Sequence, residues 1–453
     1  MAELHVWMNG LHVGVWSTLR TGTPVFRYDE AWVQAEEGRA LSLSLPFSAN
    51  LELRGDAVTN YFDNLLPDSA DIRRRLRSRF RARSAEAFDL LAAIGRDCVG
   101  AVQLMPADAE PAGWNSIDAE ALDEARVESI LASVTSDVPL GQRDEDQELR
   151  LSIAGAQEKT ALLRMGRRWY LPRGATPTTH ILKLPLGLVG NMRADMSTSI
   201  ENEWLCSRIL RALGLPVADT EIARFGDTKA LVVTRFDRHW VGIEEGAEQK
   251  ARFRPPDGAW IARLPQEDFC QALGVGPDRK YQSDGGPSML DCLAVLSNSE
   301  HAQEDQTNFL LAQFAFWLLA ATDGHAKNFS IRHRRGGSFG LTPLYDVLSA
   351  WPIIGNGPNQ IPYQRAKLAM GLKAGNMHYR LHDIQARHWQ GLAAAVSGEA
   401  WHRLTALARN VDAALAEVKA ELPVAFPSRI WTSISAGMKR HAQAFLRAPE
   451  TSF

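Results

Sequence analysis

The stretch that decides the fold is Phe314–Ile331, FAFWLLAATDGHAKNFSI. An apolar run stops at Asp323, and Asp, Gly, His, Lys and Asn follow within six residues before an apolar segment resumes. Asp323 and Asn328 have the D-x-x-x-x-N spacing of a kinase catalytic loop. A chain of this length contains about one such pair by chance, so the spacing needs support from its surroundings. The alternative is a helix C-terminus capped by Gly324 and followed by a solvated turn.

Downstream of this stretch, the sequence supplies a second acidic residue. NFSIRHRRGGSFGLTPLYD, residues 328–346, is typical of two strands around Gly336-Gly337. A hairpin of that size would bring Asp346 beside Asn328, and carboxylate and amide oxygens suit Mg2+ on nucleotide phosphates. Phosphoryl transfer also needs a carboxylate that accepts the proton of the attacking hydroxyl. We therefore predict Asp323 as the base and Asn328 and Asp346 as the metal ligands.

Upstream, HILKLP places Lys183 within an otherwise apolar strand. An exposed edge strand is the alternative explanation for this lysine. About twenty residues later, the predicted helix 199–213 contains Glu201 and Glu203. Kinases pair a strand lysine with a helix glutamate, and we prefer Glu203 as the partner.

Before that strand, LSIAGAQEKTALL, residues 151–163, contains a turn of small residues at 154–156 between strand-like flanks. Backbone N–H groups in such a turn can cradle phosphates, and Lys159 would add positive charge. The turn has one glycine and matches neither standard phosphate-loop motif, so an ordinary hairpin is the alternative. The order of turn, lysine strand, helix, catalytic loop, hairpin and Asp346 is the order of parts in a kinase.

The composition is that of a globular protein with 45% hydrophobic and 23% charged residues. The net charge of -3 gives no global attraction to nucleic acid or to an anionic membrane. Four scattered cysteines predict buried thiols in a reducing compartment. The N-terminus does not resemble a secretory signal and no apolar run is long enough to span a bilayer, so we expect a cytoplasmic protein without a membrane partner.

Periodicity along the chain predicts an α+β protein with a β-rich lobe followed by a helical lobe. With the kinase order of the parts above, we expect a protein-kinase-like, two-lobed fold. We expect a β-rich N-terminal domain with a helical tail at 1–110, with a hairpin at Asn9-Gly10 and a strand at Ala40–Pro46. A linker with a short helix at Ala119–Ser133 would occupy 111–148. A β-rich nucleotide lobe would then span 149–237, and an all-helical lobe with the catalytic loop would span 238–453.

Eight blocks of the sequence resemble the HipA family of bacterial serine/threonine kinases, toxins of type II toxin–antitoxin modules. They lie between about Leu149 and Leu372 and read SIAGAQEKTALL, THILKLP, VTRFDR, RLPQEDFCQALG, KYQSDGGP, ATDGHAKNFS, LTPLYD and KLAMGL. The segment Trp240–Trp260 is longer than is typical of the family.

The resemblance implies ATP and Mg2+ as cofactors. It makes Asp323 the catalytic base, Asn328 and Asp346 the metal ligands and Lys183 a phosphate contact. It also implies a nucleotide loop, an adenine-side hinge and two further nucleotide contacts. These are Ala154, Gly155, Ala156, Gln157, Glu158 and Lys159 for the loop, Thr234, Arg235 and Phe236 for the hinge, and His325 and Tyr345 for the further contacts.

Ser152 matches the serine that this family autophosphorylates. A phosphate there would add about -1.5 to -2 charges beside the ATP phosphates, and we expect repulsion to inactivate the enzyme. The alternative role of Ser152 is a hydroxyl that turns a strand into a loop. The resemblance further implies a HipB-like helix-turn-helix antitoxin and a target in the aminoacyl-tRNA synthetase class, typically the glutamyl enzyme.

Seven arginines between Arg73 and Arg83 are candidates for nucleic-acid contact. A solvated helix face paired with carboxylates is the favoured alternative. The chain has no convincing helix-turn-helix, so operator DNA is assigned mainly to the antitoxin. Two other functions remain open: a non-catalytic DNA-associated corepressor with a kinase-like fold, and a small-molecule phosphotransferase.

Overall fold

The computed structural model describes residues 3–135, 151–155, 157–190, 193–251 and 253–447. The chain forms two compact units, each built from separate stretches of sequence. Unit 1 comprises Met1–Leu184, Ala223–Asp278 and Arg332–Ser338, and unit 2 comprises Pro185–Ile222, Arg279–Ile331 and Phe339–Phe453. These units differ from the predicted lobes, because residues 238–278 belong to unit 1 and residues 185–222 belong to unit 2.

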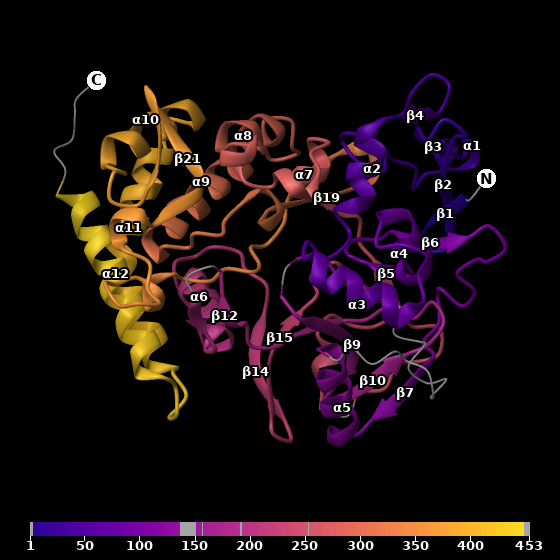
Figure 1. The fold of residues 1–453 in the computed structure, drawn as a ribbon, viewed down its shortest axis with the longest axis horizontal. Coiled ribbons are helices and arrows are strands. Elements are labelled where there is room, and N and C mark those ends of the chain that lie inside the picture. The colour runs from indigo at the N-terminus through magenta and orange to yellow at the C-terminus, as the bar shows by residue number, and fades with distance from the viewer. Residues whose placement is uncertain (1–2, 136–150, 156, 191–192, 252, 448–453) are drawn as a thin grey trace. The chain divides into compact units, whose positions relative to one another are not determined.

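Unit 1 begins with a five-stranded antiparallel sheet, indigo in Figure 1, in the order β4-β3-β2-β1-β6. The predicted hairpin is confirmed, since Asn9 (φ 46°) and Gly10 (φ 81°) adopt the left-handed conformations of a two-residue turn. Trp16 stacks on Phe62 at 4.2 Å between ring centroids, within the core that this sheet shares with its helices. The elements are β1 (Glu3–Met8), β2 (Leu11–Thr18), β3 (Pro24–Tyr28), β4 (Glu52–Arg54), β6 (Gln103–Pro106), α1 (Glu30–Gln34), α2 (Asp56–Asp63), α3 (Ala70–Phe80) and α4 (Ala87–Ile94).

A six-stranded sheet in the order β14-β15-β11-β9-β10-β7 forms the second layer of unit 1. Its strands are β7 (Ala119–Leu122), β9 (Lys159–Met165), β10 (Arg168–Pro172), β11 (His180–Lys183), β14 (Thr220–Phe225) and β15 (Thr228–Thr234). Of β14, the residues from Ala223 onward belong to unit 1. Helix α5 (Glu124–Val134) packs on this sheet through Val127 and Leu131.

The predicted helix at Ala119–Ser133 is therefore partly wrong. Residues 119–122 form an edge strand that pairs with β10, and the helix starts only after Asp123. Asp123 accepts a hydrogen bond from the Arg126 backbone N–H at 2.8 Å, which is the N-cap contact that begins the helix. Residues 136–148 of the predicted linker lie outside the described residues.

The predicted strand at Ala40–Pro46 is also wrong. This segment is a turn in which Ser42 and Leu45 form an isolated bridge. Its polar groups bond instead to distant residues of unit 1: the Leu43 N–H donates to Glu267, and the Ser44 hydroxyl donates to the Gln271 carbonyl. The remaining elements of unit 1 are β5 (Asp97–Cys98), β8 (Leu151–Ser152), β16 (Arg238–Val241), β17 (Trp260–Arg263), β18 (Gln266–Asp268) and α7 (Phe269–Ala272).

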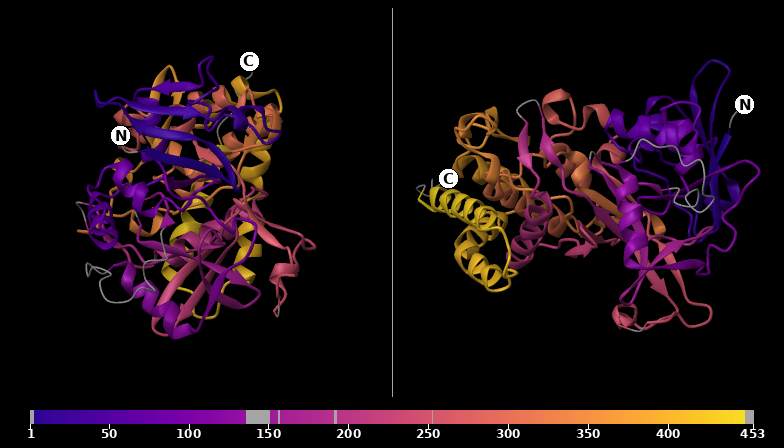
Figure 2. Two further views of the ribbon diagram at one scale, coloured as in Figure 1. Left: turned by 90° about the vertical axis from the view of Figure 1, so that its right-hand side faces the viewer. Right: turned by 60° about the horizontal axis from the view of Figure 1, so that its bottom comes forward.

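Unit 2 is mainly helical, and α11 and α12 pack against each other at the C-terminal end (Figure 2). Phe314 of α9 packs against both α10 and α12, because its ring centroid lies 5.2 Å from that of Trp389 in α10 and 4.7 Å from that of Phe445 in α12. The helices are α6 (Ser199–Ala212), α8 (Met289–Leu296), α9 (Ala302–Leu319), α10 (Ala386–Val396), α11 (Ala400–Ala420) and α12 (Ser428–Leu446).

Strands interrupt the lobe that was predicted as all-helical, so that part of the prediction is wrong. The predicted hairpin after the catalytic loop is present as β19 (Ser330–His333) and β20 (Phe339–Leu341), with Gly336 and Gly337 at positive φ. A second hairpin in that predicted lobe joins β21 (Lys367–Ala374) to β22 (Asn376–Arg380). Outside it, unit 2 also contains the antiparallel pair β12 (Gly187–Val189) and β13 (Ala194–Met196). Within the described residues, none of the helices is both long and apolar enough to cross a bilayer. All four cysteines are buried free thiols, as predicted.

Candidate active site

The segment after α9 exposes one carboxylate from an otherwise buried loop. Helix α9 ends at Leu319, Ala320 follows with φ 49°, and residues 324–330 are all buried. Gly324 does not cap the helix; a Cβ there would lie 2.3 Å from the Phe316 ring. The Asp323 side chain, in contrast, is 63% exposed. The alternative of a capped helix followed by a solvated turn is therefore wrong.

Hydrogen bonds within the loop fix where the Asp323 side chain leaves the backbone. The Asp323 carbonyl accepts from the Asn328 amide nitrogen at 2.8 Å and from the His325 backbone N–H at 2.8 Å. The buried His325 ring lies with Nε2 3.9 Å from Asp323 Oδ1. The short turn Ala326–Asn328 lies between these contacts, so a hydrogen bond across one short loop ties Asn328 to Asp323.

Tyr345 attaches the following hairpin to this loop. Its phenol donates to the Lys327 carbonyl at 2.8 Å and lies 2.6 Å from the Ser330 hydroxyl. This hydrogen bond ties the segment that carries Asp346 to the loop that carries Asn328. Asp346 has φ 58°, a left-handed conformation that aspartate tolerates but that costs free energy in a non-glycine residue.

Helix α6 supports the segment that carries Asp346. The Asn202 side chain donates to the Ser349 carbonyl at 2.8 Å and accepts from the Ser349 N–H at 2.9 Å. Glu201 and Glu203 on either side are buried, at 6% and 3% exposure. They belong to unit 2 and Lys183 belongs to unit 1, so the pairing of Lys183 with Glu203 stays a prediction.

Lys183 lies in the interior of the six-stranded sheet. Its strand β11 pairs with β15 on one side and β9 on the other, and Lys183 itself is 5% exposed. The edge-strand explanation is therefore wrong. Lys159 is the residue directly opposite Lys183 on β9. Two lysines at facing positions concentrate positive charge, which suits an anionic ligand such as a phosphate.

The loop between β8 and β9 is not a hairpin. Strand β8 pairs in parallel with β5, whereas β9 pairs with β10 and β11. Gly155 has φ 112°, and a Cβ at this position would lie 2.5 Å from Lys159 Nζ. Only glycine therefore allows both this backbone and this close approach of the lysine. The predicted loop residue Ala156 lies outside the described residues.

Contacts hold this loop against its surroundings in unit 1. Gln157 donates to the Leu184 carbonyl at 2.5 Å, and the Leu184 N–H donates to the Glu158 carbonyl at 3.1 Å. The Glu158 carboxylate forms an ion pair with Arg75 of α3. Ser152 is fully buried, and its hydroxyl donates to the Leu65 carbonyl at 2.8 Å. The Ser152 hydroxyl thus bonds to a distant segment and does not form a local turn.

Several arginines of α3 are engaged with carboxylates. Arg73 pairs with Asp63 at 2.6 Å, Arg74 with Asp71, and Arg75 with Glu158. These pairs agree with the favoured alternative of a paired helix face for that part of the cluster. Arg77, Arg81 and Arg83 are exposed.

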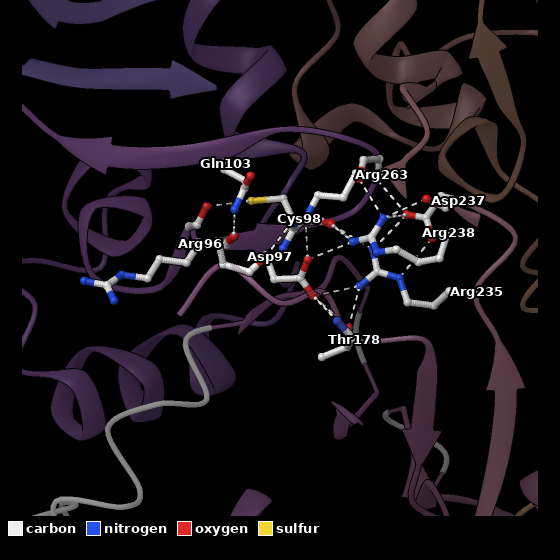
Figure 3. Close-up of polar contacts among 12 residues, drawn as sticks. Arg96, Asp97, Cys98, Gln103, Thr178, Arg235, Asp237, Arg238 and Arg263 are labelled. Carbon is white, nitrogen blue, oxygen red and sulfur yellow. Dashed lines mark hydrogen bonds and ion pairs between the residues drawn. The ribbon is translucent and has the colours of Figure 1, made fainter. Parts of the chain in front are cut away.

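The predicted hinge, Thr234–Phe236, leads into a buried cluster of charges that the sequence did not indicate (Figure 3). The side chain of Arg235 points into this cluster, where it bonds to Asp237 at 2.7 and 2.9 Å and to Thr178 at 3.0 Å. A role of Arg235 in nucleotide binding would therefore fall to its backbone. The Phe236 carbonyl accepts from Arg332 at 2.7 Å.

Asp97 of β5 is the hub of the cluster. Its carboxylate accepts from Thr178 Oγ1 at 2.7 Å, from Arg238 at 2.9 Å and from Arg263 at 3.0 Å. Burial opposes ionisation of Asp97, but the Arg238, Arg263 and Arg235 guanidinium groups outweigh it and hold the pKa of this carboxyl well below its ordinary value. Burial and Arg235 together lower the pKa of Arg238 to about 10. In the sequence, Asp97 is a single aspartate between Arg96 and Cys98, and no motif around it indicates such a hub.

The donor atoms of the loop fit a hard cation such as Mg2+. The Asn328 amide nitrogen is bonded to the Asp323 carbonyl, so the amide oxygen is the atom that can serve as a ligand. The Asp346 carboxylate would supply a second oxygen. Among the described residues, His, Cys, Asp and Glu side chains form no group of three or more that could hold a metal by themselves. A Mg2+ here would thus take its remaining ligands from phosphates and water.

The sheet with its lysine, the helix with its glutamates and the loop with its carboxylate follow one another in the order of a protein-kinase-like fold, and this is the class to which the fold belongs. Residues 4–105 match the HipA N-terminal domain, and residues 151–424 match the HipA-like C-terminal domain. The chain belongs to the HipA family.

Three relatives and one solved structure give the scale of the similarity. The chain is 34% identical to "Putative kinase Y4mE" of Sinorhizobium fredii, over 86% of this chain and 84% of that one. It is 27% identical to "Putative kinase Y4dM" of the same organism, over 80% and 81%. It is 25% identical to the serine/threonine-protein kinase toxin HipA of Shewanella oneidensis, over 71% and 69%. The fold matches a chain in the Shewanella oneidensis complex of HipA, HipB and operator DNA, with a TM-score of 0.76, 22% identity and coverage of 98% and 97%.

Proposed function

We propose that this protein is an ATP- and Mg2+-dependent serine/threonine protein kinase and the toxin of a type II toxin–antitoxin module. It transfers the ATP γ-phosphoryl group to a serine of a target protein in the cytoplasm. The observation that supports this proposal is the Tyr345–Lys327 hydrogen bond, which ties the segment that carries Asp346 to the loop from which the Asp323 carboxylate projects.

The proposal gives each candidate site residue a chemical role. The Asp323 carboxylate accepts the proton of the serine hydroxyl as the serine oxygen attacks the γ-phosphorus, and ADP leaves as the bond from the γ-phosphorus to the bridging oxygen breaks. Asn328 and Asp346 hold Mg2+, which screens the negative charge of the phosphates when it is bound. His325 and Tyr345 support the loop, and both are also predicted to contact the nucleotide. Lys183, Lys159 and the backbone of 154–159 in unit 1 bind the phosphates, and the backbone of 234–236 binds the adenine side.

Intact-mass measurement tests the enzymatic proposal. The protein incubated with Mg-ATP should gain one phosphate, and Asp323→Ala should slow this gain by about 10^2- to 10^4-fold while leaving the fold intact. Asp346→Ala should in addition weaken Mg-ATP binding. Asp412→Ala is the matched control, because Asp412 forms an exposed ion pair with Lys439 in the same unit. An unchanged rate in Asp323→Ala would rule out Asp323 as the base.

We propose Ser152 as the residue that gains the phosphate. Its hydroxyl is buried against Leu65, so the loop must leave this position before Ser152 can accept a phosphoryl group. A phosphate could not return to that site without burying its charge, which is strongly unfavourable. Ser152→Ala should abolish the mass gain and keep ATP affinity, whereas Ser152→Asp should lower ATP affinity. Unchanged ATP affinity in Ser152→Asp would remove this switch.

For partners, we propose a HipB-like helix-turn-helix antitoxin, with operator DNA bound mainly through it, and an aminoacyl-tRNA synthetase of the glutamyl type as the target. The match to a chain crystallised as HipA with HipB and operator DNA supports the first two. Incubating the protein with Mg-ATP and purified glutamyl-tRNA synthetase tests the third. A synthetase that gains no phosphate from a protein that phosphorylates itself would exclude this target.

A further inference from the structure

A tyrosine outside the predicted site bonds directly to the proposed base. The Tyr281 phenol donates to Asp323 Oδ1 at 2.5 Å. The same ring meets the buried His325 ring edge-on, with centroids 5.1 Å apart and an interplanar angle of 83°. Tyr281 is therefore held between the carboxylate that projects from the catalytic loop and the histidine beneath it. All three residues belong to unit 2.

The turn that carries Tyr281 is itself firmly anchored. The Tyr281 carbonyl accepts from the N–H groups of Asp284 and Gly286 at 3.0 Å each. Gly286 packs so closely that a Cβ there would lie 2.0 Å from the Arg279 carbonyl oxygen. The neighbouring Gln282 side chain accepts from the Gly371 N–H of β21 at 2.8 Å. The phenol is thus presented from a fixed scaffold.

We propose that Tyr281 is a positioning residue for the Asp323 carboxylate, an inference that rests on the proposed function. Because the Asp323 side chain is 63% exposed, rotation about its side-chain bonds would move both carboxylate oxygens. A hydrogen bond between a neutral donor and a charged acceptor is strong enough to hold Oδ1 in one place. The second oxygen, Oδ2, is then directed to one point, where it receives the proton of the serine hydroxyl.

A fixed donor and a blocking group predict opposite effects of removing the phenol oxygen. If Tyr281 positions the base, its loss slows proton acceptance at saturating ATP. If the phenol instead occupied the place of the serine hydroxyl, its loss would open the site and speed the reaction. The anchored turn favours positioning, since a gate has to move away in each catalytic cycle.

The test is Tyr281→Phe, which removes one oxygen and keeps the ring against His325. Initial rates of phosphate incorporation are measured by intact mass at several Mg-ATP concentrations, with ADP release as a second readout. We expect the maximal rate to fall by about 10- to 100-fold, since misplacing a reacting group has effects of this order. The ATP concentration that gives half the maximal rate and the melting temperature should not change.

Tyr363→Phe is the matched control. Its phenol bonds to His441 Nε2 at 2.8 Å in the same unit, so this variant also loses a phenol hydrogen bond. We expect a lower melting temperature and an unchanged maximal rate. A structural role for Tyr281 would give that same pattern, so a fall in rate without a fall in melting temperature separates the two roles.

The outcomes separate this inference from the function on which it rests. If Asp323→Ala is inactive and Tyr281→Phe retains the wild-type rate or exceeds it, the positioning role is overturned and the kinase assignment stands. If Asp323→Ala keeps the wild-type rate, or if the wild-type protein neither gains phosphate nor releases ADP, the proposed function is overturned and the role of Tyr281 falls with it.

Discussion

Replacing Asp97 with alanine is expected to destabilise unit 1 more than a typical substitution. The cluster around Asp97 sets three guanidinium groups, those of Arg235, Arg238 and Arg263, against the two carboxylates of Asp97 and Asp237. Removing one carboxylate leaves three buried positive charges with one negative partner. It also leaves the Thr178 hydroxyl, which donates to Asp97 at 2.7 Å, without this acceptor.

The expected loss follows from these contacts. Breaking a buried ion pair by deleting one partner costs about 3–5 kcal/mol, and Asp97 is the hub of several such contacts. We therefore expect Asp97→Ala to lower the free energy of unfolding by about 4 kcal/mol or more at pH 7. For a folded unit of 150–250 residues, each kcal/mol moves Tm by about 2–4 °C, so the thermal transition of unit 1 should fall by roughly 8–16 °C.

The assay is thermal and urea unfolding of the full chain, with Asp71→Ala as the control. Asp71 forms an exposed ion pair with Arg74 on α3 of the same unit, and such surface pairs contribute only about 0–1 kcal/mol. If Asp97→Ala loses no more stability than Asp71→Ala, the cluster does not hold unit 1 together and the reasoning is refuted.

Acid adds a second, signed check on Asp97. The pKa of this carboxyl is depressed in the folded protein, so its contribution to stability is complete above the unfolded pKa of about 3.9 and declines as pH falls below that value. The stability difference between wild type and Asp97→Ala should therefore be constant from about pH 7 to 5 and shrink below about pH 4. A difference that grows on acidification would contradict the assigned sign.

Three further predictions concern the loop, the helix α6 and a buried histidine. Gly155→Ala should lower the affinity for a non-hydrolysable ATP analogue in calorimetry, because φ at Gly155 is 112° and the new Cβ would meet Lys159. The control is Gly174→Ala, which should leave the affinity unchanged, because Gly174 has φ 57° and a Cβ there would have nothing within 4 Å. Asn202→Ala should cost about 1–3 kcal/mol in urea unfolding and weaken Mg-ATP binding, because both Ser349 backbone groups lose their partner; normal Mg-ATP binding would argue against a link to Asp346. Burial first, and then Arg164, lowers the pKa of His180 from 6.5 to about 3, so the unfolded state binds a proton below pH 6.5 that the folded state does not. Between pH 6.5 and about 3, the free energy of unfolding of the wild type should therefore fall by up to about 1.4 kcal/mol for each pH unit of acidification. Urea unfolding at several pH values should show a shallower slope for His180→Gln if the assignment is right.

Local signals predicted most of the secondary structure well. Asn9-Gly10 needs two left-handed residues, so it marks a hairpin wherever it occurs between strands. Gly214 marks the end of α6, and the glycine pair Gly336-Gly337 marks the turn between β19 and β20, because all three have a positive φ that most other residues avoid. The predictions of secondary structure were wrong where hydrogen bonds to residues far away in the sequence determine the local conformation. Residues 40–46 alternate like a strand, yet Glu267 and Gln271 bond to them in place of a neighbouring strand.

The candidate site shows the same division. The spacing of Asp323 and Asn328 and the hairpin that leads to Asp346 are local properties, and Tyr345 bonds the segment before Asp346 to the loop. Asp97 has no comparable spacing motif, and the block KYQSDGGP that contains Tyr281 does not indicate its contact with Asp323, since each acts through residues far away in sequence. Asp97 reaches residues 166 positions away, and Tyr281 reaches Asp323 across 42 positions. The proposed phosphate-binding residues lie in unit 1 and the proposed catalytic loop lies in unit 2, so their pairing stays a prediction.

The interleaving of the two units has a consequence for biosynthesis. Unit 1 draws its last stretch from Arg332–Ser338, where Arg332 donates to the Phe236 carbonyl and His333 bonds to Glu267 at 2.8 Å. A ribosome must therefore translate about three quarters of the message before this unit can close on all of its own segments. Fragments cut near residue 237 or 278 would leave those acceptors without their native donors, so the two units are poor candidates for separate expression and the chain is best produced whole.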